Sequence, residues 1–413
     1  MSVQALPRSA SLPALPLNRG FVLKAAAVVA AGVLLALFSS VQLGVMWAIG
    51  LAFGFILQRS RLCFASAFRD LWLMRDGRNM KAILAGVAVA LGGFALLMQK
   101  AVPDATTGAL PNQAHVAPVG LALIAGGVLF GIGMVVAGGC VSGSMYRVGE
   151  GYVASALALL GVLGGLELAA HSWNWWYLHS ISTAPMVWLP GELGYGGALV
   201  LSAALLLAGY LGLTWWESRK PPMIGLKKKV EPEPVGFQAQ VNASWRRIFV
   251  KGWPMLAGAV ALAVLNIFAY TYQGPLGVTG ELSAWADRLA SLAGWGAGPL
   301  LGAGQLAGCN LASAAGGTWL TPTFALDAGV IFGSFVAAVL ASEFKIRLAR
   351  QKRRYVQSAA GGVAMGYGAA LAVGCTIGAF FSAIPSLGLN GWAFGLSLLA
   401  GSFAGVKIIQ RIA

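Results

Sequence analysis

The sequence predicts an all-α polytopic membrane protein, made of two inverted repeats with about ten spans and with broken or short helices that meet at a central constriction. Three observations predict this class: the composition, the distribution of cations, and a glycine-cysteine motif that occurs twice. Of the 413 residues, 58% are hydrophobic and only 10% are charged, and the mean hydropathy is +0.76. A soluble domain could not bury so much apolar surface, so a lipid bilayer must be the solvent.

Ten apolar runs have roughly the length that crosses a membrane. The first run, 25–39, follows a long polar leader, and no small-residue cleavage site comes after it. We therefore interpret it as a retained first span rather than a cleaved signal peptide. Several later runs are short or interrupted by glycine, which predicts tilted or broken helices. The other nine runs lie near 44–58, 82–98, 119–137, 153–171, 195–215, 253–271, 324–343, 356–373 and 391–407.

The positions of Lys and Arg predict the orientation. If the amino terminus is inside and the chain alternates through ten spans, all of the 28 cations except Lys100 and Arg288 fall on one side. Because cations are retained on the cytoplasmic side, both termini are expected there, in a cell inner membrane. This asymmetry also accounts for the net charge of +15 and argues against a nucleic-acid partner.

A polar stretch divides the chain into two halves. It contains Lys227, Lys228 and Lys229 and several prolines, as expected of a linker. The predicted organisation is a cytoplasmic tail at 1–24, an extra span within 25–43, a first repeat half at 44–216, a basic cytoplasmic linker at 217–251 and a second repeat half at 252–413.

The same glycine-cysteine template ends one apolar run in each half. Gly131–Gly143 and Gly366–Gly378 both read Gly-x-Gly, five residues, Gly-Cys, two residues, Gly. With the predicted topology the two copies enter the membrane from opposite sides, as in inverted-repeat transporters whose discontinuous helices meet near the midplane. The predicted substrate path consists of Cys63, Cys140, Cys375 and Cys309, with supporting turns at Gly138, Gly139, Gly143, Gly374 and Gly378.

Glycine before each motif cysteine allows the backbone to turn and leave its helix. The residues that follow, 141–147 and 376–385, are expected to begin a second short helix whose first amide groups attract an anion. A thiol there is a weak donor and a polarizable neighbour, which suits a large, weakly hydrated sulfur anion better than chloride or phosphate. The competing interpretation is that each cysteine is a small hydrophobe in a helix-packing seam.

Charged residues near the cysteines allow two interpretations. Arg61, Arg69 and Arg147 either form a cytoplasmic vestibule that receives anions or are solvated charges that set the topology. Two acids, Glu167 and Asp327, lie within or near spans, where ionisable groups are functional candidates. We expect Glu167 to reach water at the outer end of its span and Asp327 to cap its helix, so neither is predicted to relay protons.

At these residues the chain resembles the YeeE/YedE family of membrane proteins, described as sulfur-compound (thiosulfate) transporters. The matching motifs are Leu57–Asp70, Gly131–Gly151 and Gly366–Gly378, and the likeness covers most of 44–407. The resemblance implies an hourglass-shaped helical fold whose two vestibules narrow to a thin barrier. There, cysteines pass thiosulfate along by S–H···S hydrogen bonds.

Carried over residue by residue, the resemblance assigns this relay to Cys63, Cys140 and Cys375. Cys309 lies outside the matching motifs, which leaves its role open, and the run 25–39 lies outside the shared core. Relatives also work with a small cytoplasmic sulfur-carrier protein, which the basic inner face could dock. Some relatives are linked to selenium metabolism, so the substrate is either thiosulfate or a selenium analogue.

The expected function is therefore import of thiosulfate or a related sulfur-containing anion, by a protein that is not an enzyme and uses no cofactor or metal. The sequence contains no nucleotide-binding Gly-rich loop ending in Lys-Ser or Lys-Thr, so direct coupling to ATP is not expected. The alternatives are a selenium-compound transporter of the same fold, a membrane thiol-redox protein and a Cu(I) transporter. A redox protein usually has a Cys-x-x-Cys motif, and a Cu(I) transporter has Met or His ligands beside its thiolates; the sequence has neither pattern.

Overall fold

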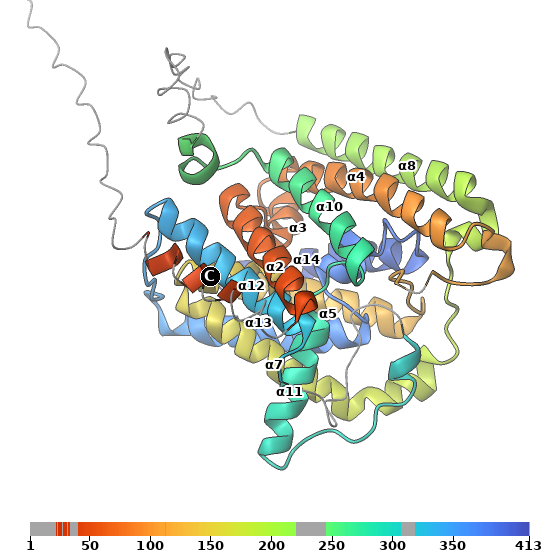
Figure 1. The fold of residues 1–413 in the computed structure, drawn as a ribbon. Coiled ribbons are helices and arrows are strands. Elements are labelled where there is room, and N and C mark those ends of the chain that lie inside the picture. Colours follow the sequence, from red (N-terminus) through yellow and green to blue (C-terminus); the bar gives the residue numbers. More distant parts are fainter. Residues whose placement is uncertain are drawn as a thin grey trace, which may run out of the picture.

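The computed structural model describes residues 40–111, 113–219, 245–306 and 319–412, together with scattered positions between 22 and 33. Within these residues the secondary structure is helical, apart from two isolated β-bridges (Figure 1). Eight of the described helices are long and apolar enough to cross a membrane, or nine when a pair bent by 47° is counted as one further span. The predicted all-α polytopic class is confirmed. Most of the expected first span, 25–39, lies outside the described residues.

The nine expected spans after the first each coincide with a helix of the structure. The longer helices are α2 (Val41–Ser60), α3 (Phe64–Leu73), α4 (Arg78–Ala101), α5 (Leu121–Ala137), α6 (Val141–Gly149), α7 (Val153–Trp176), α8 (Leu189–Ser218), α10 (Met255–Tyr272), α11 (Thr279–Leu292), α12 (Pro322–Leu340), α13 (Lys352–Leu371) and α14 (Leu389–Ile412). The short ones are η1 (Ala105–Thr107), η2 (Tyr177–Ile181), η3 (Arg246–Val250), η4 (Ala303–Gln305) and η5 (Thr376–Ser382).

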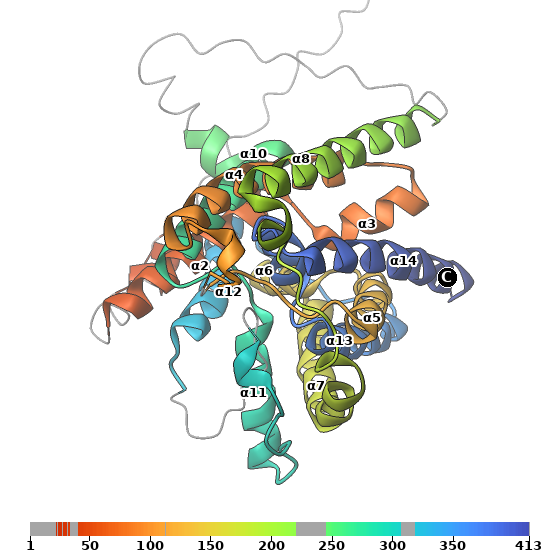
Figure 2. The ribbon, with the colours of Figure 1, turned by 90° about the vertical axis from the view of Figure 1, so that its right-hand side faces the viewer.

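The long helices form two groups of four, each with two helices from each half of the chain. One group contains α2, α4, α10 and α12, and the other contains α5, α7, α13 and α14 (Figures 1 and 2). The short helices α3, α6 and η5 contact both groups and so lie between them. A seam between two helix groups is a place where discontinuous helices of inverted-repeat transporters form their sites.

The largest helix contacts between the two halves occur in matching pairs. Packing of α2 on α12 corresponds to packing of α10 on α4, and α5 on α14 corresponds to α13 on α7. The counterparts run in opposite directions: α2 ends beside the start of α10, where the Trp253 amide donates to the Arg59 carbonyl over 2.8 Å. This antiparallel exchange is the arrangement that inverted repeats produce.

Small residues allow the α2–α12 pair to approach closely. A Cβ on Gly54 would lie 2.0 Å from the Val330 carbonyl oxygen, and a Cβ on Gly333 would lie 2.1 Å from the Leu51 carbonyl oxygen. Any side chain at either position would push the helices apart. Apolar solvent gives helices little hydrophobic drive to associate, so such close backbone contact is a main source of their packing energy.

Helix α8 has no counterpart in the second half. It lies beside α4 at the edge of the molecule (Figures 1 and 2). Its last turn is fixed there, because the Glu217 carboxylate pairs with Lys81 and accepts a hydrogen bond from the Gly77 amide over 2.6 Å. Several of its large apolar side chains, such as Val200 and Leu207, are exposed, as expected for a helix that faces lipid.

Candidate substrate path

Each of the three described cysteines is the N-cap residue of a short helix. Cys63 precedes α3, Cys140 precedes α6 and Cys375 precedes η5. A cysteine at this position faces the unpaired amide groups and the positive end of the helix dipole. The clearest case is Cys140, whose sulfur accepts a hydrogen bond from the Gly143 amide over 3.4 Å.

Glycine lies at the break before both motif cysteines, although in the second half Val373, with a left-handed φ of 52°, shares the turn with Gly374. Helix α5 ends at Gly138, which has the left-handed φ of 82° that side chains disfavour, and α6 begins three residues later. In the second half Gly374 has a φ of 157°, and η5 begins two residues later. The Gly378 amide, in the first turn of η5, approaches the Cys375 sulfur. Gly139 lies beside Arg147, since a Cβ on Gly139 would lie 3.4 Å from the Arg147 guanidinium.

The thiols of Cys63 and Cys140 converge on one point. A Cβ placed on Gly143 would lie 3.2 Å from the Cys140 sulfur and 3.4 Å from the Cys63 sulfur. The Thr376 hydroxyl, adjacent to Cys375 in the chain, approaches the Cys140 thiol from the other half. Cys63 and Cys140 thus adjoin each other, and Cys375 follows at the start of η5; we call these three residues the line of thiols.

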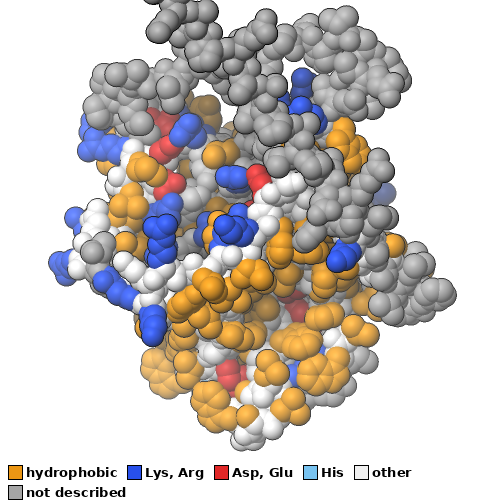
Figure 3. All heavy atoms as spheres, turned by 90° about the vertical axis from the view of Figure 1, so that its left-hand side faces the viewer, with side chains coloured by type: hydrophobic (Ala, Val, Ile, Leu, Met, Phe, Trp, Pro, Cys, Tyr) orange, Lys and Arg blue, Asp and Glu red, His pale blue; other side chains and the backbone are white. Residues whose placement is uncertain are grey.

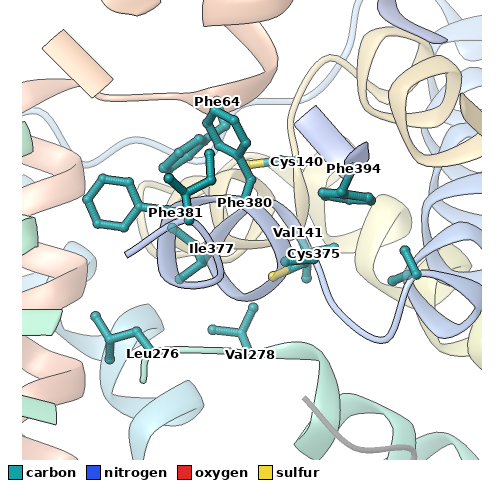
Figure 4. Packing of buried hydrophobic residues seen from close by; sticks show 14 of the residues in the cluster. Phe64, Cys140, Val141, Leu276, Val278, Cys375, Ile377, Phe380, Phe381 and Phe394 are labelled. Carbon is teal, nitrogen blue, oxygen red and sulfur yellow. The ribbon is translucent and has the colours of Figure 1, made fainter. Parts of the chain in front are cut away.

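This line of thiols runs through a closely packed apolar centre. Cys63 is 3% exposed, and both Cys140 and Cys375 are fully buried. Figure 4 shows the sulfurs of Cys140 and Cys375 among aromatic and aliphatic side chains from α3, α6 and η5, with Phe64 packed edge-on against Phe381. The centre of the molecule is thus closely packed in the described residues, and thiols, hydroxyl groups and a few other buried polar side chains, such as Asn266 and His115, interrupt its apolar surface.

Val278 lies on the far side of Cys375 (Figure 4). It is the N-cap residue of α11, and its amide approaches the Cys375 sulfur. Because α11 packs on α7 as α3 packs on α14, Val278 holds the place in the second half that Cys63 holds in the first. The sequence had suggested Cys309 as the fourth thiol of the path, but Cys309 lies outside the described residues.

A cavity of about 710 Å³ leads to Cys63, and we call it the basic cavity. Its four cations, Arg61, Arg147, Lys345 and Arg347, outnumber the acids Glu150 and Glu343. The other lining residues are Cys63, Ser66, Tyr146, Tyr152, Ser342 and Phe344. Figure 3 shows one face of the molecule on which Lys and Arg side chains gather above a broad hydrophobic area.

Two of the three predicted vestibule residues line the basic cavity. Arg61 is largely exposed and pairs with Glu343 over 3.1 Å. Arg147 is held beside the α5–α6 turn because its guanidinium donates to the Gly138 carbonyl. Arg69 is not among the lining residues and pairs with its neighbour Asp70 over 2.8 Å.

Glu343, which follows α12, organises this cavity, although no sequence motif marks it. Its carboxylate accepts hydrogen bonds from Gln58 over 3.0 Å, from Arg59 over 2.6 Å and from Arg61 over 3.1 Å. Burial alone would raise the pKa of Glu343, but Arg59, Gln58 and Arg61 together hold it below the usual value. At Glu150, where burial is the largest effect, the pKa is raised. A sequence signal existed only for the partners, since Gln58 and Arg59 directly precede the Arg61-Leu-Cys63 motif.

Both intramembrane acids lie elsewhere than predicted. Glu167 does not reach water: it is 3% exposed, and its carboxylate lies 3.4 Å from the His171 imidazole. Asp327 does not cap its helix, because Thr321 is the N-cap residue and accepts from the Phe324 amide over 2.9 Å. The two predictions were wrong because the packing of neighbouring segments, which covers both side chains, cannot be read from position along a span.

His115 is a further buried polar residue close to the path. It lies between α4 and α5, outside the membrane-spanning helices, and its ring carbon Cε1 would be 3.3 Å from a Cβ on Gly374. Its Nε2 has no hydrogen-bond partner in the described part of the chain. Burial lowers the pKa of His115 to about 4, so the ring is neutral at physiological pH. The neutral imidazole can therefore donate or accept a hydrogen bond beside Cys375 without adding charge.

A helical bundle of two opposed halves, in which a basic cavity meets a line of buried thiols, defines a polytopic membrane transport protein. The comparison with known sequences makes this specific. The chain belongs to the sulphur transport family, whose sequence pattern matches residues 59–404. The resemblance to YeeE/YedE proteins inferred from the motifs is confirmed.

Three relatives illustrate the likeness. A protein of Spirochaeta thermophila named thiosulfate transporter TsuA is 30% identical over 369 residues, which cover 88% of this chain and 98% of that protein. The Escherichia coli protein of the same name is 28% identical over 352 residues, covering 83% of this chain and 88% of its own length. A probable transporter YedE of Salmonella typhimurium is 34% identical over 178 residues, 43% of this chain and 42% of its own.

Proposed function

We propose that this chain imports thiosulfate, or a closely related sulfur oxyanion, across the inner membrane through the line of cysteines. One observation carries the proposal: three buried thiols stand at the starts of three short helices and end at a cavity rich in cations. The relatives named thiosulfate transporters support this choice of anion.

In the import direction, the anion first meets Cys375 and then passes to Cys140 and Cys63. Each thiol donates an S–H hydrogen bond to the terminal sulfur of thiosulfate, a soft acceptor that matches a soft donor. The adjacent helix starts, through amides such as that of Gly143, add favourable potential for negative charge. The path needs no fixed cation at its centre, so the anion is not trapped there.

The basic cavity receives the anion after Cys63. Arg61 and Arg147 attract it, while Glu150 and Glu343 limit the net positive charge and so keep release possible. The same surface suits docking of a small sulfur-carrier protein on the cytoplasmic side, an extension that rests on the family resemblance.

Uptake of radiolabelled thiosulfate tests the proposal, in cells that lack other sulfate and thiosulfate permeases. Cys140→Ala and Cys375→Ala are each expected to abolish uptake and leave the amount of folded protein in the membrane unchanged. Ser202→Ala is the matched control, because Ser202 is a buried small polar residue of the peripheral helix α8 whose hydroxyl has no partner in the described structure. Undiminished uptake in both cysteine variants would refute the relay. Cys309→Ala, measured alongside, decides whether the fourth cysteine takes part.

A thiol-redox function is the second candidate, and the convergence of the Cys63 and Cys140 sulfurs on Gly143 favours it. Such a protein would cycle between a dithiol and a disulfide. Mass spectrometry of protein alkylated in membranes, before and after mild oxidation, separates the two functions. The transport proposal expects both thiols to be reduced in cells that take up thiosulfate, and therefore alkylated once the protein is rapidly denatured in the presence of the reagent. Selenium analogues are distinguished by their ability to compete with labelled thiosulfate.

A further inference from the structure

Asp327 is buried in the second turn of α12 with nothing to stabilise a negative charge. Asp327 is only 5% exposed, and neither of its carboxyl oxygens has a hydrogen-bond partner in the described part of the chain. An unpaired carboxylate is expensive to bury away from water. The structure therefore accommodates Asp327 as the neutral acid, with a proton on one oxygen.

Glu281, the neighbouring acid on α11, has the opposite environment. Its carboxylate accepts hydrogen bonds from Trp285 over 3.0 Å, from Thr321 over 2.6 Å and from Thr323 over 2.7 Å. All of these partners donate, which matches an ionised carboxylate. The two acids therefore differ: Glu281 has three hydrogen-bond donors, whereas Asp327 has none in the described part of the chain. A buried carboxyl group without donors is the one that favours holding a proton.

Two titratable groups lie within electrostatic range of Asp327. They are Glu281 on α11 and the Cys375 thiol that follows α13. Helix α2 packs along α12, but its one ionisable residue, Arg59, lies at the opposite end beside Glu343. Helices α6 and η3 also meet α12 toward that end, where Gly149 contacts Ser334. Asp327 therefore senses the thiol line and is separated from the cations of the basic cavity.

Import of a doubly negative anion into a cell with a negative interior works against the membrane potential, and each proton that enters with the anion lowers by one the negative charge moved against that potential. We propose that Asp327 is the proton-binding site of a thiosulfate–proton symport, an inference that rests on the proposed function. In each cycle the O–H bond of Asp327 breaks, its proton crosses with the anion that reaches Cys375, and the carboxylate takes up another proton from the outer side. This assigns to Asp327 the proton role that its position in the sequence alone did not indicate.

The test uses the full chain reconstituted in liposomes and two assays of labelled thiosulfate. One assay measures uptake driven by an external pH one unit below the internal pH, and the other measures exchange of labelled for unlabelled thiosulfate without a gradient. For the wild type we expect the gradient to accelerate uptake several-fold and a protonophore to remove the acceleration. For Asp327→Asn, which imitates the neutral acid, we expect exchange to persist and the acceleration to vanish.

Glu167→Gln is the matched control, because Glu167 is also a buried intramembrane acid but lies beside His171 on α7. It should keep the response to the gradient, and a pH dye should report proton entry with thiosulfate in this variant and the wild type but not in Asp327→Asn. Wild-type uptake that ignores the gradient, or a full gradient response in Asp327→Asn, would overturn the coupling while leaving thiosulfate transport in place. Absence of exchange by the wild type would overturn the proposed function and the coupling with it.

Discussion

Gly143 is the point at which two helix starts bring two sulfurs together. Its backbone is not left-handed, so the residue is required for space rather than for conformation: both thiols lie within 3.4 Å of where a Cβ would stand. Contacts that short force a neighbour to move by a few tenths of an ångström. The spacing between Cys63 and Cys140 depends on this absent side chain, and so, in the proposed mechanism, does the transfer of an anion between them.

Gly143→Ala should therefore slow thiosulfate uptake by about tenfold or more, since small displacements of positioned groups have large effects on a transfer step. The protein should still fold, because alanine is favoured over glycine inside a helix. Initial uptake rates, normalised to protein detected in the membrane, measure the effect. Gly164→Ala on α7 is the control, because a Cβ there meets no atom within 4 Å. Equal uptake by the two variants would contradict this role for Gly143.

The residues of the proposed path are of two kinds. Some are positioned by a local sequence pattern, and others are positioned by contacts with segments far away in the sequence. Cys140, Cys375 and their glycines could be predicted, because a glycine break followed by an N-cap residue is a local pattern. Val278 and Glu343 could not, since each acquires its meaning from a contact with a segment far away in the sequence. Cys309, the other thiol suggested for the path, lies outside the described residues, and the helix exchange places Val278 opposite Cys63.

Among the elements, the segment between α12 and α13 contributes most to the basic cavity. It closes one wall through Glu343, which binds the guanidinium of Arg59, a side chain only 1% exposed. Arg59 also donates to the Val250 carbonyl over 3.0 Å, so the end of α2, the end of α12 and η3 are joined by one network. Loss of the carboxylate would leave a buried cation short of a partner.

Glu343→Gln should lower stability by about 1–3 kcal/mol at neutral pH, the range for a hydrogen bond to a charged group. Because the pKa of Glu343 is held below its usual value, the stabilisation is present at neutral pH and is lost as the pH falls through that lowered pKa. The difference in unfolding temperature between the wild type and Glu343→Gln should therefore shrink on acidification. Thermal unfolding of purified protein at several pH values measures this.

Asp70→Asn provides the comparison, because the Arg69–Asp70 pair joins sequence neighbours and should contribute little. A Glu343→Gln protein as stable as the wild type at neutral pH would show that the network does not hold the cavity wall.

At this scale the sequence predicted the nine later spans well, since apolar length alone defines them. It did not predict α11, which is short and amphipathic, or the π-helical form of η5.

At the scale of the whole molecule, the ends of distant helices gather at two opposite faces. Gln58 on α2 reaches Glu150 after α6 over 3.0 Å, and Tyr152 pairs with Arg347, so these ends share the face with the basic cavity. At the other face, Trp188 pairs with Gly388. The cations thus concentrate at one mouth of a path whose centre is apolar, an arrangement that draws anions to that mouth from a distance.

This charge separation predicts that Cys63 is reached by anions from one side only. In inside-out membrane vesicles, a membrane-impermeant anionic methanethiosulfonate should label Cys63 through the basic cavity, and thiosulfate should slow the labelling because both compete for the same cations. In right-side-out vesicles Cys63 should stay unlabelled, because the packed apolar centre separates it from the outer face. Cys63→Ala identifies the labelled residue.

A cationic reagent should react more slowly from the inside, since the four cations of the cavity repel it. Faster labelling of Cys63 from the outer face would reverse the proposed orientation, and equal rates for the two reagents would show that the cavity's charge does not select anions.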